Sequence, residues 1–484
     1  MKDDRPTPDG DEPAPIPFRD PSGTALPRII APPPGRNSRW LAECGAWFEP
    51  RPSLGIVDGK LPIGWLGARG ANVVDMDGNR YVDLTGGFGA ALVGHRNPNV
   101  VACMRDASSR LLHGLADAAP HPLRMALAGA LSVQGPIRNG RVLFATSGAE
   151  AIDIALKTAH LATGHAGVVA FEGGYHGTSL GALRATGRPA FREPFEEALE
   201  PATLRVPYAD CYRCPYSLTY PSCGLACLDA ALAEVDAWNA DLPKPRLGAW
   251  VVEPILGREG VVVPPPGWLA ALGKAARERG ILVVADEILT GGGRTGREWA
   301  SGPLKPDLAT VGKGITGGMP LAAAIGRPDL MKAWEGEGEA RHATTYMANP
   351  VAVAATWAAL GEIRRLKLPE RARAIGQLLR AGLAKIRRRH PAIGDVRGKG
   401  GLWGIDFVAD RTTREPDPSA AAEASEALAR RGYLALAGSR HGNVIVLTPP
   451  AVITDRQLEG FLESLEDVLM QSGKPGSDPG TSHR

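Results

Sequence analysis

The chain has 484 residues, of which 44% are hydrophobic and 22% charged, a composition typical of a globular protein with a large core. Its 55 basic and 52 acidic side chains nearly cancel, and no basic stripe carries interleaved aromatic residues, which argues against a nucleic-acid partner. No apolar run is long enough for a membrane span, and the acidic, proline-rich start does not resemble a secretory signal, so we expect a cytoplasmic protein.

The two ends of the chain differ in composition from the rest. Residues 1–37 are rich in proline and charge, and residues 473–484 are rich in glycine, serine and proline. We expect a flexible arm and a flexible tail there. Between them we expect a large domain over residues 89–355 and a small domain assembled from residues 38–88 and 356–472.

Short apolar runs in the middle of the chain alternate with helical patterns. Helices are predicted at 147–164, where Ile152, Leu156 and Ala159 have helical spacing, and at 267–280. Apolar strands separated by helices favour a parallel sheet covered on both faces, and therefore an α/β fold. The predicted strands are 141–146, 167–172, 249–255, 281–287 and 307–312.

The last third of the chain has a different pattern. Residues 453–469 have the spacing of an amphipathic helix, and Thr454 and Gln457 have the spacing of a capping box at its start. The apolar segments 400–410 and 443–450 predict strands. We expect these elements to form a smaller α+β domain.

Polar residues and glycines follow several of the predicted strands. Ligands of parallel sheets bind beyond the carboxyl ends of the strands, so these residues should meet in one site. Ser147, Gly148 and Ala149 come between a strand and a helix, where free N–H groups can bind a phosphate. Taken alone, this segment is equally consistent with an ordinary turn.

Two aromatic rings and two acids follow the next strands. Tyr175 and His176 lie in the glycine-rich segment "GGYHG", where they can contact a flat ligand or simply pack. Glu253 and Asp286 stand within or at the end of apolar runs. A buried carboxylate needs a hydrogen-bonding or cationic partner, and a salt bridge to an arginine is the plainer explanation.

Lys313 lies between Gly312 and Gly314, where the last apolar run ends. Desolvation lowers the pKa of a lysine and frees its amine to attack carbonyl groups. A phosphate cradle, an aromatic ring, a buried Asp286 and a reactive lysine together match the needs of pyridoxal 5'-phosphate. Lys313 would form the Schiff base, and the aspartate would keep the pyridine nitrogen protonated.

Two further motifs are compatible with other kinds of site. The segment 291–296, "GGGRTG", matches a dinucleotide-binding pattern, but no helical periodicity follows it, which argues against a nicotinamide or flavin site. Four cysteines have spacing compatible with either a zinc site or free thiols. We assign them no catalytic role and name no metal ligand; they are Cys211, Cys214, Cys223 and Cys227.

From about residue 38 to 471 the sequence resembles the class III, or ω-, aminotransferases, which have fold type I of the pyridoxal phosphate enzymes. The resemblance implies a mostly parallel seven-stranded sheet, a smaller α+β domain, small amine and oxo-acid substrates, and a homodimer, or a tetramer, with shared active sites. It is carried by six motifs in family order: "TSGAEA", "FEGGYHG", "VVEPILGREG", "ADEILTGGGRTG", "VGKGITGGMP" and "HATTYMANP".

The resemblance also implies roles for individual residues. Lys313, Asp286 and Glu253 would be the catalytic residues, with Glu253 on the substrate side. Thr345 would bind the cofactor phosphate of the neighbouring subunit. The other implied cofactor contacts are Ser147, Gly148, Ala149, Tyr175, His176 and Ile288, and the implied substrate contacts are Phe88 and Arg258.

The sequence departs from the family pattern at three positions. Leu289 replaces a frequent glutamine, and Gly292 replaces a frequent phenylalanine and would widen the site. Val446 replaces the arginine that grips the α-carboxylate in many members through a bidentate pair. Arg258 or Arg440 would have to substitute for it.

We therefore predict an aminotransferase that moves an amino group from an amine, ω-amino acid or amino acid to a 2-oxo acid or aldehyde. The alternative is an epimerase, decarboxylase or lyase on the same fold, because Lys313 and Asp286 serve all of these reactions. A non-enzymatic relative would have lost the lysine, the aspartate or the phosphate loop, and all three are present.

Overall fold

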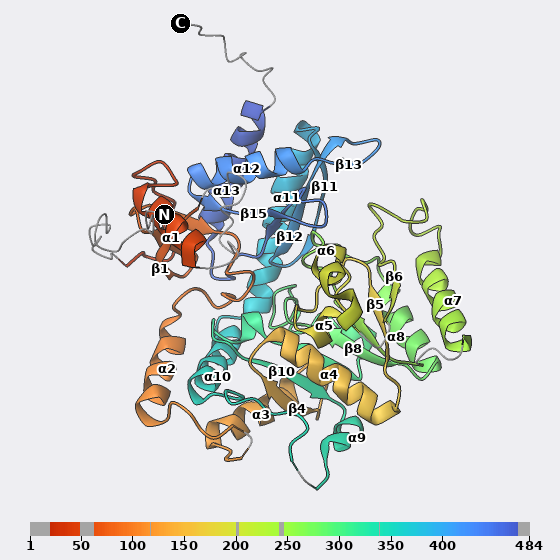
Figure 1. Cartoon of the computed structure of the whole chain (residues 1–484). Helices are drawn as coiled ribbons and strands as arrows, with labels where there is room; N and C mark the ends of the chain where they lie inside the picture. The colour runs from red at the N-terminus through yellow and green to blue at the C-terminus, as the bar shows by residue number, and fades with distance from the viewer. Residues whose placement is uncertain are drawn as a thin grey trace, which may run out of the picture.

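The computed structural model describes residues 20–48, 62–116, 118–199, 203–241, 246–337 and 339–472. A seven-stranded sheet forms the centre of the large domain (Figure 1), in the order β4-β10-β9-β8-β7-β5-β6. Strand β10 runs antiparallel to β4 and β9, and the other pairs are parallel. This confirms the predicted sheet. Its strands are β4 (Arg141–Ala145), β5 (Gly167–Phe171), β6 (Thr203–Val206), β7 (Leu247–Val252), β8 (Leu282–Asp286), β9 (Leu308–Val311) and β10 (Ala322–Gly326).

Helices cover both faces of this sheet because its strands are apolar on both sides. Val168 packs with helix α4 (Gly148–Thr163) on one face, whereas its neighbour Val169 belongs to the cluster on the other face. Side chains alternate across a strand, so consecutive apolar residues supply two separate cores. The second face is covered by α3 (Pro122–Gln134), α7 (Ala226–Ala240), α8 (Trp268–Glu278) and α10 (Pro350–Arg365).

Helix α4 begins and ends where the sequence predicts. The Ser147 hydroxyl accepts a hydrogen bond from the Glu150 N–H, which caps the first turn. Gly164 follows the last turn with φ 71°, a left-handed conformation that glycine adopts without steric cost. The start of α4 is therefore fixed directly after β4.

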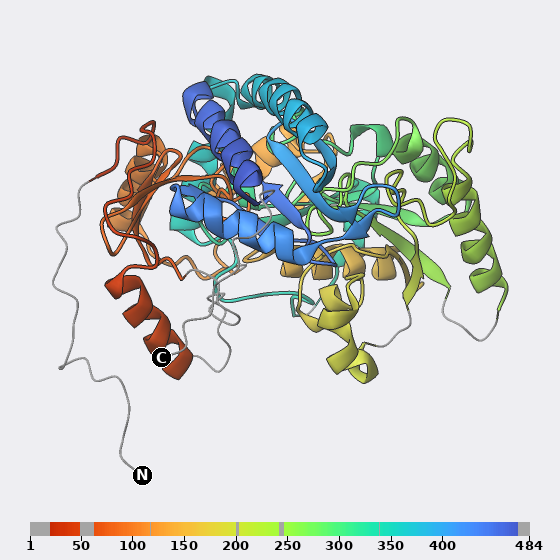
Figure 2. The ribbon, with the colours of Figure 1, turned by 90° about the horizontal axis from the view of Figure 1, so that it is seen from above.

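The small domain lies at one side of the large sheet, and its last two helices lie next to each other in both views (Figures 1 and 2). Its C-terminal sheet has the order β11-β12-β16-β15. The predicted capping box is confirmed, because Gln457 N–H donates to Thr454 Oγ1 (3.2 Å) and Thr454 N–H donates to Gln457 Oε1 (3.0 Å). The elements are α11 (Leu368–Arg389), β11 (Ile393–Lys399), β12 (Leu402–Asp410), β13 (Glu415–Pro416), α12 (Pro418–Arg430), β14 (Tyr433–Leu434), β15 (Leu436–Gly438), β16 (Val444–Leu447) and α13 (Asp455–Ser472).

An N-terminal sheet joins this small domain through the parallel pairing of β14 with β3. The described part of the predicted flexible arm is packed rather than free. The Ile30 N–H donates to Asn79 Oδ1 (2.8 Å) and the Ala25 N–H to Asn72 Oδ1 (3.0 Å). Residues 1–19 and 473–484 lie outside the described residues. The N-terminal elements are α1 (Arg36–Phe48), β1 (Trp65–Arg69), β2 (Asn72–Asp75) and β3 (Arg80–Asp83).

Helix α10 crosses the boundary that we predicted between residues 355 and 356. Its residues Ala355, Ala359 and Ile363 all belong to the core cluster of the large domain. An apolar helix face that packs continuously gives no place for a domain boundary. The remaining helices are α2 (Pro98–Arg110), α5 (Leu180–Leu183), α6 (Pro189–Arg192) and α9 (Pro328–Met331), with short 3-10 turns at Glu193–Ala198, Gly302–Leu304, Lys313–Ile315 and Lys332–Trp334. No described helix is both long and apolar enough to cross a membrane.

Candidate active site

A cavity of about 600 Å³ opens beyond the carboxyl ends of β4, β5, β7, β8 and β9. Residues that follow these strands form one wall, and residues from β15 and β16 of the small domain form another. The structure therefore brings together the groups that follow five separate strands. The predicted site residues that line this cavity are Phe88, Gly148, Ala149, Tyr175, His176, Glu253, Arg258, Asp286, Ile288 and Lys313.

Two predicted residues are absent from the lining of this cavity. The Ser147 side chain is occupied by capping α4. Thr345 is exposed, and its carbonyl oxygen lies 2.7 Å from His113 Nε2. Thr345 therefore does not line the cavity of its own chain. The role predicted for Thr345 concerns the cavity of a neighbouring subunit and stays a prediction.

Asp286 is held rigidly at the end of β8. Its Oδ2 lies 2.8 Å from His176 Nδ1, and its Oδ1 accepts hydrogen bonds from Ile288 N–H (3.0 Å) and Thr310 Oγ1 (3.2 Å). Burial opposes protonation of His176, but the hydrogen bond and charge of Asp286, with the charge of Glu253, outweigh it and raise the pKa of His176. The salt bridge to an arginine that we considered for Asp286 does not form among the described residues; its partner is a histidine.

Lys313 follows β9 directly and has a left-handed backbone, with φ 43°. Such a conformation costs a non-glycine residue roughly 1–2 kcal/mol, and it is typical of positions with a functional constraint. Burial lowers the pKa of the Lys313 ammonium, and the charges of Arg258 and Arg294 act in the same direction, against Asp286 and Glu253. A larger fraction of the amine is therefore unprotonated and able to attack a carbonyl carbon.

Glu253 follows β7 and is buried beside these groups, with 6% of its surface exposed. Its carboxylate accepts hydrogen bonds from Tyr175 N–H (2.9 Å) and Gly257 N–H (3.0 Å). Burial, which outweighs these contacts and the charge of His176, raises the pKa of Glu253 to about 7, with a further contribution from Asp286. Glu253 is thus a carboxyl group that can hold or release a proton near neutral pH.

The N-terminus of α4 presents two N–H groups to the cavity. Among the described residues, the N–H groups of Gly148 and Ala149 have no hydrogen-bond partner, as expected in the first turn of a helix. A Cβ atom at Gly148 would lie 3.2 Å from Ile288 Cγ2, so a larger residue would crowd this wall. The geometry suits an anion such as a phosphate.

The positions that depart from the family pattern have different surroundings. Leu289 and Val446 line the cavity with apolar side chains. Gly292 is absent from the cavity lining, and a Cβ atom there would lie 2.6 Å from Ile315 Cγ2, so its smallness serves packing and does not widen the site. Arg440 also lies outside the cavity and pairs with Glu259 at 2.9 Å.

Several residues at the site were not predicted from the sequence. Thr310 supports Asp286 from within β9, and Arg188 and Ser439 line the cavity. Thr310 is a polar residue within an apolar strand, and this contrast could have predicted that its hydroxyl binds a buried polar group. Arg188 and Ser439 lie in loops that carry no periodicity, and their positions depend on how the two domains meet.

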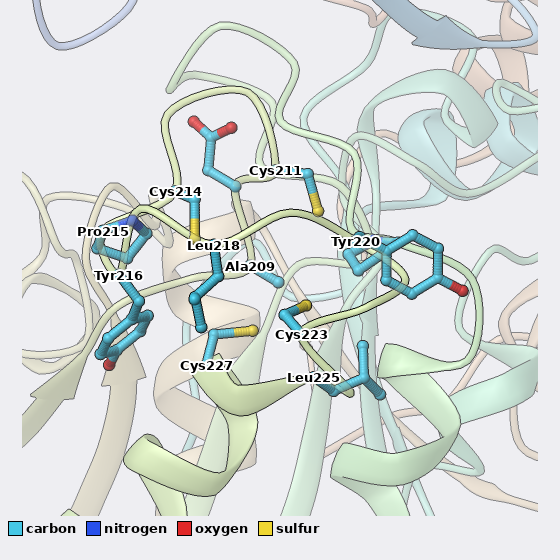
Figure 3. Close-up of a pocket in the computed structure, with 12 residues that line it drawn as sticks. Ala209, Cys211, Cys214, Pro215, Tyr216, Leu218, Tyr220, Cys223, Leu225 and Cys227 are labelled. Atoms are coloured by element: carbon cyan, nitrogen blue, oxygen red, sulfur yellow. The ribbon is translucent and has the colours of Figure 1, made fainter.

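The four clustered cysteines lie together in a separate pocket, around the loop that leads into α7 (Figure 3). All six cysteines of the chain are free thiols. Among the described residues, no group of three or more His, Cys, Asp or Glu side chains is placed to hold a metal ion. Burial and the neighbouring thiols raise the pKa of Cys211 and Cys227, which keeps these thiols weakly nucleophilic.

The sequence pattern of the Aminotransferase class-III family matches residues 59–469. The chain belongs to this family. It is 35% identical over 417 residues to a 2-aminoadipate transaminase of Pseudomonas putida, covering 85% of this chain and 96% of that protein. It is 32% identical over 422 residues to a leucine/methionine racemase of Thermococcus litoralis, covering 86% and 93%.

A solved structure agrees with this assignment. An amine transaminase from an uncultivated Pseudomonas species, in its PLP-bound form, superposes with a TM-score of 0.79 at 29% identity, over 85% of this chain and 95% of that chain. The predicted family and fold type I architecture are thereby confirmed. The protein is a class III aminotransferase that depends on pyridoxal 5'-phosphate.

Proposed function

We propose that this class III aminotransferase moves an amino group from an amine, ω-amino acid or amino acid donor to a 2-oxo acid or aldehyde, with Lys313 as the residue that transfers the proton. The Lys313 amine and the buried Asp286 carboxylate meet in one cavity, which supports chemistry on pyridoxal phosphate. The 35% identity to a 2-aminoadipate transaminase favours transfer of an amino group. The lowered pKa of Lys313 favours its neutral amine, the form that attacks a carbonyl carbon and accepts a proton.

Pyridoxal phosphate, when bound, supplies an electron-poor ring that accepts the electron pair left when a bond to the amino-bearing carbon is broken. Asp286 would accept a hydrogen bond from the protonated pyridine nitrogen. His176 and Thr310 hold that carboxylate in place, so its charge stays fixed toward the ring. Lys313 would take the proton from the substrate carbon and deliver it to the neighbouring cofactor carbon.

The other cavity residues would bind and orient the cofactor. The free N–H groups of Gly148 and Ala149 would bind its phosphate. The Tyr175 ring and the Ile288 side chain, which both line the cavity, would cover the two ring faces. Glu253 would lie on the substrate side and hold or release a proton, as its raised pKa allows.

A homodimer would complete the site. Phe88 lines the cavity but leaves 69% of its surface exposed, and Tyr346, next to Thr345, leaves 65% exposed. Leu112 and Leu115 expose 66% each in the segment after α2. A second copy would cover these exposed apolar side chains and would bring its Thr345 to the phosphate.

The expected cytoplasmic location stays part of the proposal. Its support is the six free thiols, because a reducing compartment keeps cysteines in this state.

A second candidate is a racemase or epimerase, favoured by the 32% identity to a leucine/methionine racemase. That reaction uses the same lysine and aspartate, but the proton returns to the same substrate carbon and the amino group stays. Substrate-side residues decide between the two outcomes.

One experiment separates these activities. Protein loaded with pyridoxal phosphate is mixed with single donors without an acceptor, and the visible absorption band of the bound cofactor is followed. The donors are glutamate, alanine, γ-aminobutyrate, ornithine, putrescine and β-alanine. A transaminase converts the band to that of pyridoxamine phosphate, and Lys313→Ala loses the original band. A racemase keeps the band and exchanges the α-proton of one amino acid for deuterium in D₂O, which would refute the first proposal.

A further inference from the structure

We propose that Arg258 and Arg188 form a carboxylate-binding subsite in the cavity, so that the substrates of this chain carry a carboxylate. The proposal rests on the proposed function, because it names the substrate class of the same cavity. It assigns to two arginines the task that Val446 cannot perform.

Arg258 is a cation held in place without a charged partner. Its guanidinium carbon lies 4.7 Å from the ring centre of Tyr175 and 5.2 Å from that of Phe191. Among the described residues, Arg258 forms no hydrogen bond and no ion pair. Stacking on aromatic rings fixes the guanidinium while leaving its N–H groups free to bind an anion.

Arg188 packs on the same Phe191 ring as Arg258. Its guanidinium carbon is 5.4 Å from the Phe191 ring centre, and its Nη2 donates a hydrogen bond to Ser439 O of the small domain (2.7 Å). Burial lowers the pKa of Arg188, and the charges of Arg258 and Arg440 act in the same direction, against Glu259. The two arginines thus line one cavity and contact one ring, and their positive charges repel each other.

The charged groups around Arg188 and Arg258 carry more positive than negative charge. Glu259 is the acid that acts on Arg188, and Glu259 is already paired with Arg440 at 2.9 Å. Glu253 is buried, and burial favours its neutral form. An anion placed between Arg188 and Arg258 would relieve their repulsion and accept hydrogen bonds from both.

The rest of the cavity offers no equivalent cation. Among its described lining residues, the other basic side chains are His176, which binds Asp286, and Lys313, which the reaction uses. Leu289 and Val446 are apolar and cannot bind a carboxylate. The cofactor phosphate has its own donors at the start of α4, so the arginines remain available for the substrate.

The charge of Arg258 also acts on Lys313, the reacting amine. It contributes to the lowered pKa of Lys313, and it lines the same cavity. A carboxylate bound at Arg258 would therefore lie on the same molecule as an amino group near Lys313. This favours amino acids, including ω-amino acids, over amines that lack a carboxylate.

The test uses ligand binding rather than turnover. The cofactor-loaded protein is titrated calorimetrically with valerate and with valeramide, which has a similar shape and no charge. We expect valerate to bind at least about tenfold more tightly, because a hydrogen bond to a charged group contributes enough for one to two powers of ten in affinity. Equal affinities for the two ligands would overturn the proposal.

Variants assign the effect to the two arginines. Arg258→Gln and Arg188→Gln should each lower the preference for valerate about tenfold or more. Arg192→Gln is the matched control, because Arg192 is next to Phe191 but pairs with Glu196 at 2.9 Å and is absent from the cavity lining. Retention of the full preference in Arg258→Gln would overturn the proposal. If that variant does not load cofactor, Arg258→Lys should retain part of the preference.

The outcomes distinguish this proposal from the proposed function. If donors with and without a carboxylate convert the cofactor equally well in wild type and Arg258→Gln, only the subsite is wrong. If valerate is preferred but no donor converts the cofactor, the subsite stands and the transaminase proposal fails.

Discussion

Asp286→Asn tests the electrostatic core of the proposed chemistry. Asparagine has nearly the same shape as aspartate, and its oxygen can still accept from Ile288 N–H and Thr310 Oγ1. The side chain loses its negative charge and presents an amide group to His176 Nδ1 instead. We expect the fold and cofactor loading to survive and the proton transfer to slow.

The size of the effect follows from the charge that Asp286 would present to the protonated ring nitrogen. Two opposite unit charges at the length of a charge-assisted hydrogen bond, about 2.8 Å, attract by roughly 6 kcal/mol at an effective dielectric constant of about 20. The remaining hydrogen bonds and solvation recover about half of this. A loss of ~3 kcal/mol in the transition state slows the reaction about a hundredfold, since each ~1.4 kcal/mol is one power of ten.

The assay is the rate at which a saturating donor converts the cofactor band in a single turnover. The matched control is Asp307→Asn, because Asp307 is a buried aspartate directly before β9, at the opposite end of that strand from Lys313, where it binds Arg327 at 2.6 Å. That variant should lose stability and keep the rate. An Asp286→Asn rate within threefold of wild type would refute the reasoning about charge.

Three further predictions concern Glu253, the phosphate cradle and the dimer. Because the pKa of Glu253 is raised to about 7, the native state holds a proton that the unfolded state has lost, and stability falls as pH rises toward 7. Glu253→Gln should therefore show a smaller fall in Tm between about pH 5 and pH 8, and parallel curves would contradict this. Gly148→Val should raise the Kd for pyridoxal phosphate about tenfold, since its Cβ would crowd Ile288, and an unchanged titration would argue against the cradle. Thr345→Glu and Lys313→Ala should each be inactive, yet mixed subunits should regain activity, because a heterodimer keeps one complete site; no recovery would refute site sharing.

Much of the site was predictable from the sequence because its residues follow recognisable strands. Apolar runs predict strands, and parallel strands end at one edge, so Asp286 and Lys313 were expected in the same place. The start and the end of α4 were also predictable, because a serine caps its first turn and a glycine closes its last turn, each acting on adjacent residues. These patterns depend on a few consecutive residues and not on contacts with distant parts of the chain.

Other features came only from contacts between distant segments. The pairing of β14 with β3 and the packing of residues 20–35 on the small domain carry no local pattern. Helix α10 extends across a predicted boundary because its apolar face continues into the large core. The spacing of the four clustered cysteines could not distinguish a zinc site from free thiols, because spacing does not determine how the four side chains are oriented.

The sequence by itself determined the chemistry: a lysine and an aspartate placed at strand ends, together with a helix start suited to phosphate. Only the tertiary structure distinguished the arginines in and near the cavity from one another. Arg258 stacks on Tyr175 and has no charged partner among the described residues, whereas Arg440 pairs with Glu259. Arg188 also lines the cavity, although the sequence around it shows no pattern that predicts this. Charge pairing depends on which side chains meet in space, and that arrangement is set by the packing of two domains rather than by the order of residues.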